Sequence, residues 1–120
     1  MTIPFRRALN EYELCCQTAS IGTTPVAASV VVPAKGRLKR TYAVTGGVTT
    51  GTTSIAVKIN GGAETGTPLA VPAGSGGVSA SDNTKFGVGA VNEGDVITFT
   101  PSGGTGASIP GFFVAVIQRD

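Results

Sequence analysis

The side chains in this sequence that could bind a partner most directly are cationic. Six of the nine Lys and Arg residues gather in two short segments: Arg6, Arg7, Lys35, Arg37, Lys39 and Arg40. Side chains two positions apart on a strand share one face, so Lys35, Arg37 and Lys39 predict an outward basic stripe. Such a stripe can dock on an acidic protein surface, where charge guides the approach and fixes the register. An edge strand that carries Lys and Arg to block aggregation explains the stripe equally well.

Groups that could catalyse a reaction are scarce. The sequence contains no histidine, which is the commonest general base and metal ligand. Glu93 and Asp95 flank Gly94 in an expected loop, and such a pair of carboxylates could join a calcium site or act as an acid pair. We favour an acidic turn before a strand, in which Asp95 bonds its own backbone. No enzyme, cofactor or metal site is therefore predicted.

Two further pairs of ionisable side chains lie between residues 11 and 16. Glu11 and Glu13 alternate outward on an expected strand, which indicates a solvated or interfacial face. Cys15 and Cys16 are adjacent, so on a strand they point to opposite faces and cannot easily bridge each other. The chain has no other cysteine, and we interpret these two as small, half-buried apolar side chains.

Glycine divides the chain into segments of strand length. Eight of the 18 glycines form four pairs, at residues 46–47, 61–62, 76–77 and 103–104, and short runs rich in Val, Ile, Thr and Phe lie between them. Glycine reaches positive φ without steric cost, and β-branched residues fit a pleated strand. The pattern therefore predicts an all-β domain of strands and tight turns, and 120 residues are enough for one domain.

We expect an extended N-terminal arm over residues 1–11 and a single β-sandwich domain over residues 12–120. Residues 5–19 fit helical spacing and strand alternation alike, so a local helix is the open alternative. About eight strands are expected: one near Tyr12 and others at residues 26–32, 37–45, 53–59, 67–71, 84–91, 96–100 and 112–117. Strands of this number and length favour an antiparallel sandwich with jelly-roll wiring. An immunoglobulin-like sandwich is the alternative, but the sequence has no Trp and no spaced pair of cysteines.

Alternation within the strands predicts the core. On residues 37–45, Leu38, Tyr42 and Val44 share the apolar face, and Arg40 falls on that face as the one exception. The last strand is wholly apolar and is expected to be central. The predicted shared core consists of Leu38, Tyr42, Ile55, Val57, Ile59, Ile97, Phe99 and Phe113.

The composition indicates a protein that hides much of its surface against partners. Only 13% of its residues are charged, about half the usual share, while 41% are hydrophobic. A net charge of +2 is too small to indicate a nucleic-acid binder, and no segment approaches the ~18 apolar residues of a membrane span. Residues 1–7 lack the apolar core of a secretory signal, which predicts synthesis and assembly in the cytoplasm.

Three runs of the sequence, residues 30–44, 55–61 and 91–97, carry a resemblance. They are similar to small tailed-bacteriophage virion proteins that coat or cement the capsid, or that form the heads of fibres. The resemblance spans about residues 26–120 and supplies no catalytic residue. It implies a jelly-roll-like domain that assembles on the outside of the shell as a homotrimer, or as a dimer, and bridges neighbouring major capsid subunits.

Our leading hypothesis is a non-enzymatic capsid decoration protein of a virion, made in the host cytoplasm. Its expected partners are further copies of itself and the major capsid protein, which it would contact through Arg6, Arg7, Lys35, Arg37, Lys39 and Arg40. Neither a membrane nor nucleic acid is expected as a partner. The alternative is a receptor- or glycan-binding module of a head or tail fibre, which the lack of Trp and the presence of only two Tyr disfavour.

Overall fold

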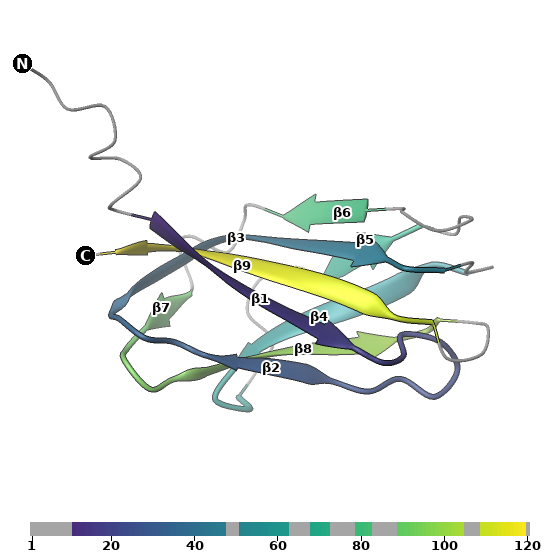
Figure 1. The fold of residues 1–120 in the computed structure, drawn as a ribbon, viewed down its shortest axis with the longest axis horizontal. Helices are drawn as coiled ribbons and strands as arrows, with labels where there is room; N and C mark the ends of the chain where they lie inside the picture. The colour runs from purple at the N-terminus through teal and green to yellow at the C-terminus, as the bar shows by residue number, and fades with distance from the viewer. Residues whose placement is uncertain are drawn as a thin grey trace, which may run out of the picture.

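Two antiparallel sheets make up the protein in the computed structural model (Figure 1). The structure describes residues 11–47, 51–62, 68–72, 79–82, 89–104 and 109–119, and for residues 79–82 it gives the backbone alone. The expected arm therefore lies outside the described residues except for Glu11, and so do Arg6 and Arg7. The first strand begins at Glu11, so the helical alternative does not apply to residues 11–18.

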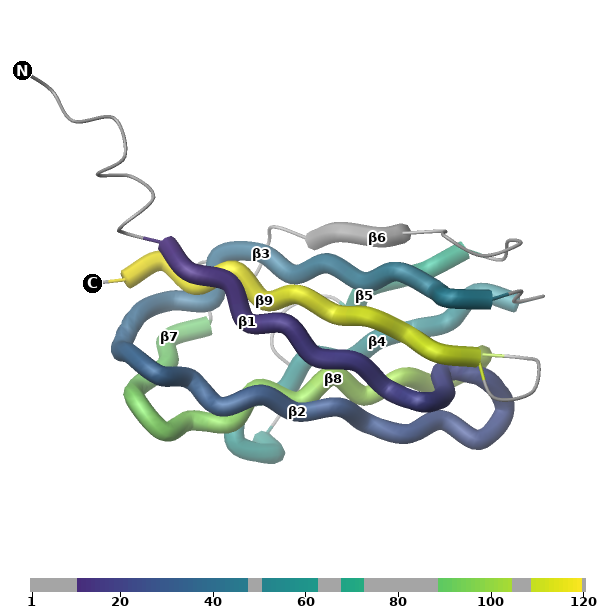
Figure 2. Tube along the Cα trace, in the orientation of Figure 1, coloured from purple at the N-terminus to yellow at the C-terminus, as the bar shows by residue number. Residues whose placement is uncertain are grey.

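Sheet A has the strand order β1–β9–β3–β6, and β7 also pairs with β3. Its strands are β1 (Glu11–Thr18), β3 (Gly36–Thr45), β6 (Ser79–Asp82), β7 (Ala90–Val91) and β9 (Gly111–Arg119). Sheet B has the order β2–β8–β4–β5. Its strands are β2 (Ala28–Val31), β4 (Thr53–Ile59), β5 (Leu69–Val71) and β8 (Val96–Ser102). Figure 2 shows β1, β9 and β3 running side by side as one layer, with β2 and β8 in the other.

The chain crosses between the sheets in the manner of a jelly roll. It passes from β1 in sheet A to β2 in sheet B, returns to sheet A for β3, and runs through sheet B for β4 and β5. It then adds β6 and β7 to sheet A, β8 to sheet B and finally β9 to sheet A. β6 and β7 both lie along β3, so the nine described strands fill eight positions. The prediction of an all-β antiparallel sandwich is confirmed, and the strand order is consistent with jelly-roll wiring.

β9 lies at the centre of sheet A, as its apolar sequence predicts. It pairs with β1 along eight residues and with β3 along its whole length of nine residues. Its inward side chains Phe113, Ala115 and Ile117 are fully buried. Phe112 points outward and is 41% exposed, so β9 also contributes apolar surface to the outer face.

The two sheets meet at an aromatic stack. The ring of Phe99 from β8 lies on the ring of Phe113 from β9, with 4.9 Å between the centroids and planes within 4° of parallel. Both side chains are buried, and with them the predicted core residues Leu38, Ile55, Val57 and Ile97, while Ile59 packs against the cluster as a partly buried residue. These core predictions are confirmed.

Tyr42 is the core prediction that is wrong, and a β-bulge explains it. Leu38 of β3 pairs with Ile117 and Arg40 pairs with Val116, so Lys39 is an extra residue on β3. An extra residue reverses the alternation beyond it, because side chains switch faces at every position. Thr41 and Ala43 are consequently buried, while Tyr42 is 37% exposed. The same bulge moves Arg40 from the predicted apolar side to the outer face.

Hydrogen bonds and close packing between loops and strands stabilise the two ends of the sandwich. The Tyr12 hydroxyl of β1 donates to the carbonyl of Ala34 at 2.5 Å, which ties sheet A to the β2–β3 connection. At the other end, the Thr18 hydroxyl donates to the carbonyl of Val26 at 2.5 Å. Gly104 approaches Ile21 so closely that an added Cβ would overlap the Ile21 carbonyl oxygen. A glycine is required there by packing.

Phe113→Ala tests the stacked core. We expect it to lower the free energy of unfolding by about 3–5 kcal/mol, because it removes a buried ring and leaves a cavity beside Phe99. Phe112→Ala is the matched control on the same strand and should cost less than about 1 kcal/mol, since that ring faces outward. Chemical denaturation measures both. Equal losses for the two variants would contradict the assigned faces of β9.

Deletion of Lys39 tests the bulge. Without it, Leu38 still faces inward and Arg40 still faces outward, so we expect the variant to fold and to lose less than about 2 kcal/mol. Deletion of Thr41 is the control, because it forces either Tyr42 or Arg40 into the core and should prevent stable folding. Thermal unfolding followed by circular dichroism distinguishes the two. If both deletions unfold the protein alike, the bulge is not where we place it.

Candidate interaction faces

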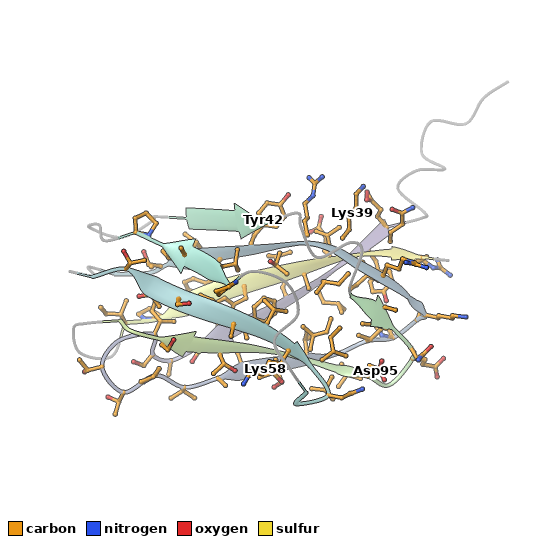
Figure 3. All side chains as sticks on the ribbon, turned by 180° about the vertical axis from the view of Figure 1, so that it is seen from behind. Lys39, Tyr42, Lys58 and Asp95 are labelled. Atoms are coloured by element: carbon orange, nitrogen blue, oxygen red, sulfur yellow. The ribbon has the colours of Figure 1, made fainter. Side chains whose placement is uncertain are left out.

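The outer face of sheet A holds an open hollow of about 380 Å³. It is lined by two acidic, two basic, one aromatic and two aliphatic residues: Glu11, Glu13, Lys39, Arg40, Tyr42, Val114 and Val116. Lys39 and Tyr42 project from this side of the sandwich in Figure 3, whereas Lys58 projects from the opposite side. The combination of charge and apolar surface suits recognition of another molecule.

Strand register places these side chains in rows across three strands. One row is Glu13, Val116 and Arg40, from β1, β9 and β3 in turn. The row on one side of it contains Glu11, Gln118 and Arg37. The row on the other side contains Cys15, Val114 and Tyr42. The acidic side chains thus stand on β1, the basic ones on β3, and β9 separates them with a mostly apolar line.

An ion pair and a hydrogen bond connect four of the side chains that line the hollow on sheet A. The Lys39 ammonium donates to a Glu11 carboxylate oxygen at 2.5 Å and bridges the β9 strand between them. Arg40 donates from Nη1 to the Tyr42 hydroxyl oxygen at 3.2 Å, and this hydrogen bond raises the pKa of Arg40. An arginine side chain is charged at any ordinary pH, so Arg40 contributes a positive charge to the lining of the hollow.

The predicted basic residues of β3 lie on an outer face that they share with acidic residues of β1. Lys35 and Arg37 are exposed, while Lys39 and Arg40 are half-buried on the outer face of sheet A. Their docking role stays a prediction, and so does that of Arg6 and Arg7. That Glu11 and Glu13 share this face could not be predicted from the sequence, because the strand that brings β1 near β3 is the last in the chain.

The two cysteines lie on opposite sides of β1. Cys15 is exposed on the outer face of sheet A, and Cys16 is half-buried toward the interior. Burial raises the pKa of the Cys16 thiol to about 11, and the neighbouring Cys15 adds to the shift. The prediction that the two thiols face apart is confirmed.

The acidic loop is a structural turn. A carboxylate oxygen of Asp95 accepts the backbone N–H of Asn92 at 2.9 Å, and this bond lowers the pKa of Asp95. Gly94 adopts φ of +88°, which a residue with a side chain rarely does. The turn interpretation of Glu93–Asp95 is confirmed. Among the described residues, no three metal-binding side chains come together, and none of these residues forms a helix that could cross a membrane.

The outer face of sheet B is chemically different from that of sheet A. Its outward positions carry mostly small or hydroxylic side chains: Ser29, Val31, Ser54, Ala56, Lys58, Ala70, Val96, Thr98, Thr100 and Ser102. Ser29, Thr98 and Lys58 fall in one row by register, and the Ser29 and Thr98 hydroxyls hydrogen-bond at 2.9 Å. Lys58 is the one charged residue at these positions.

Comparisons with known proteins identify a fold and no family. No protein-family model matches the chain, and no curated protein matches it. Among solved structures, it is similar to the catalytic unit of a thermostable GH87 α-1,3-glucanase from Streptomyces thermodiastaticus strain HF3-3, at 14% sequence identity and a TM-score of 0.50. The match covers 92% of this chain and 26% of the glucanase chain, so the fold corresponds to about a quarter of that protein.

Thiol labelling tests the assigned faces of β1. At pH 8 and low protein concentration, we expect one thiol to react with a maleimide quickly, because only about one in a thousand Cys16 side chains is a thiolate at three units below its pKa. Cys15→Ser should abolish the fast reaction, and Cys16→Ser should preserve it. Fast labelling of both cysteines in the folded protein would contradict the geometry.

Proposed function

We propose that the protein is a non-enzymatic structural protein of a bacteriophage virion, which binds the outside of the capsid and cements neighbouring major capsid subunits. The jelly-roll sandwich agrees with the fold that the resemblance of residues 30–44, 55–61 and 91–97 implies. The observation that carries the proposal is the outer face of sheet B, where Lys58 is the single charge among ten outward residues.

A face of this kind suits contact with a large protein surface. About 25% of the residues of a typical soluble domain are charged, whereas the buried centres of protein interfaces are depleted of charge. Thr98 and Thr100 stand on β8, which lies between β2 and β4. Val31 on the neighbouring strand is 59% exposed and Val26, just before that strand, is 52% exposed. Small side chains leave the strands accessible, so a capsid surface can approach closely.

The basic residues of β3 and the arm form a second predicted contact. Arg37 and Lys35 are exposed at the start of β3 and just before it, where they can meet acidic residues of the major capsid protein. Exposed ion pairs each contribute only ~0–1 kcal/mol, so they would adjust the orientation of the bound protein more than its affinity. Copies that bridge several capsid subunits would still be retained tightly, because their contacts act together.

A glycan-binding module of a fibre is the second candidate, and the hollow on sheet A favours it. Tyr42 offers a half-exposed ring there, beside charged groups from Glu13 and Arg40 that can hydrogen-bond hydroxyls. Sugar binding that Tyr42→Ala abolishes, together with failure to decorate capsids, would favour this candidate over capsid cementing.

Thr100→Glu tests capsid binding through sheet B. We expect the variant to decorate undecorated capsids of the same phage at least about tenfold more weakly than the parent, because a carboxylate would be buried without a partner. Thr100→Ser is the matched control and should bind like the parent. Co-sedimentation across a series of protein concentrations measures the affinity.

Two further variants separate the predicted contacts. Arg37→Glu and deletion of residues 1–7 should weaken decoration only at low salt, since exposed charges are screened. If Thr100→Glu binds as tightly as the parent while these two lose binding, the capsid contact lies on the basic residues and not on sheet B. Parent protein that fails to bind capsids at all would overturn the proposed function.

A further inference from the structure

The outer face of sheet A has an arrangement of charge that is complementary to itself. Acidic Glu11 and Glu13 line one side of β9, and basic Arg37 and Arg40 line the other, at matching positions along the strands. Lys39 is already paired with Glu11 within the chain. Among the described residues, Glu13 has no ion-pair partner. The face therefore offers both acidic and basic side chains for ion pairs with a second molecule.

We propose that two copies of the chain pack through the outer faces of sheet A, related by a two-fold axis that runs along β9. A half-turn about such an axis keeps the position along the strands and exchanges the two sides of β9. Glu13 of one copy then lies over Arg40 of the other, and the reverse contact forms as well. Such isologous interfaces, in which both copies use the same patch, are the commonest in soluble oligomers.

The centre of the proposed interface is apolar. Val116 and Val114 of β9 lie on the axis and meet their own counterparts, and Phe112 extends the line toward the start of the strand. Phe112 is 41% exposed and Tyr42 is 37% exposed, so both lose exposed apolar surface when a second copy covers the face. An apolar centre with a charged rim is the usual composition of a specific interface.

The charge pattern disfavours the other simple way of stacking the two faces. A two-fold axis that runs across the strands places β1 over β1, which brings Glu13 near carboxylates of the second copy and Arg40 near guanidinium groups, and like charges repel. The arrangement that places β1 over β3 pairs opposite charges on both sides. It also indicates a dimer in preference to the homotrimer implied by the family resemblance, because a two-fold face closes after two copies.

This inference is independent of the proposed function. Self-association uses mainly Glu13, Arg40 and the outward residues of β9, whereas the main capsid contact is proposed for sheet B; Arg37 is the residue that both proposals share. The dimer can be measured without a capsid. The large apolar side chains of the face, Phe112 and Tyr42, are only partly exposed, so we expect a weak dimer that should be assayed from about 1 µM to about 1 mM.

Two charge reversals test the dimer by complementation between chains. Glu13→Arg places two cations opposite each other in its homodimer, and Arg40→Glu places two carboxylates opposite each other. Each variant alone should therefore be monomeric at concentrations where the parent dimerises. Mixed together, the two should form a heterodimer, because the introduced arginine of one chain then faces the introduced glutamate of the other, and the remaining Glu13–Arg40 contact is native. Sedimentation velocity measures all four samples.

Controls make the result decisive. Lys58→Glu on sheet B should dimerise like the parent, and the far-UV circular dichroism of each variant should match the parent, which shows that it is folded. A parent that is monomeric at about 1 mM, a parent that is a trimer, or single variants that dimerise like the parent would overturn the inference. Folded monomeric variants that do not associate on mixing would also overturn it.

Cys15 provides a second measurement on the unaltered protein. It is exposed on the outer face of sheet A in the row of Val114 and Tyr42, so a second copy should cover it. Its labelling rate should fall severalfold as the protein concentration rises through the dissociation constant. In the Glu13→Arg variant the rate should not depend on concentration. A concentration-independent rate in the parent would contradict the dimer.

Discussion

The two sheets share one interior, and each strand can give it only alternate side chains, because successive residues of a strand point to opposite faces. This constraint governs everything else in the molecule. Phe99 and Phe113 can stack across the interior because both fall on inward positions of central strands. Because of the same alternation, the side chains of Phe112 and Val114 point outward. The chemistry of each outer face is therefore set by the strand residues that point away from the core.

Alternation was enough to predict most of the core and the class of fold. Ile55 and Val57 on β4, and Ile97 and Phe99 on β8, follow the period of two without interruption, so their burial could be predicted from the sequence. On β3 the period breaks at Lys39. The break was visible in advance as an arginine, Arg40, on the apolar side, but the sequence alone could not show whether that arginine was buried or whether the strand was bulged.

The faces could not be predicted in the same way, because they depend on which strands become neighbours. Glu13 and Arg40 lie far apart in the sequence, and they share a face only because β9, from the end of the chain, inserts between β1 and β3. Jelly-roll wiring creates such long-range neighbours on both sheets. Residues 35–40 taken alone therefore predict a basic stripe, whereas in the folded chain these residues share a face with β1, and Glu11 pairs with Lys39.

The contrast between the two faces has a physical consequence if the protein both associates with itself and coats a repeating surface, as we propose. Charges of both signs on one face admit few partners, because every misplacement brings like charges together. A face of Ser, Thr and Ala with the single charge of Lys58 imposes no such restriction, so its binding depends on shape and on the exclusion of water. Self-recognition on sheet A would then fix the spacing of the sheet B faces in a dimer. Two weak contacts held at a fixed spacing match a lattice whose subunits repeat at that spacing, and not a lattice of another period.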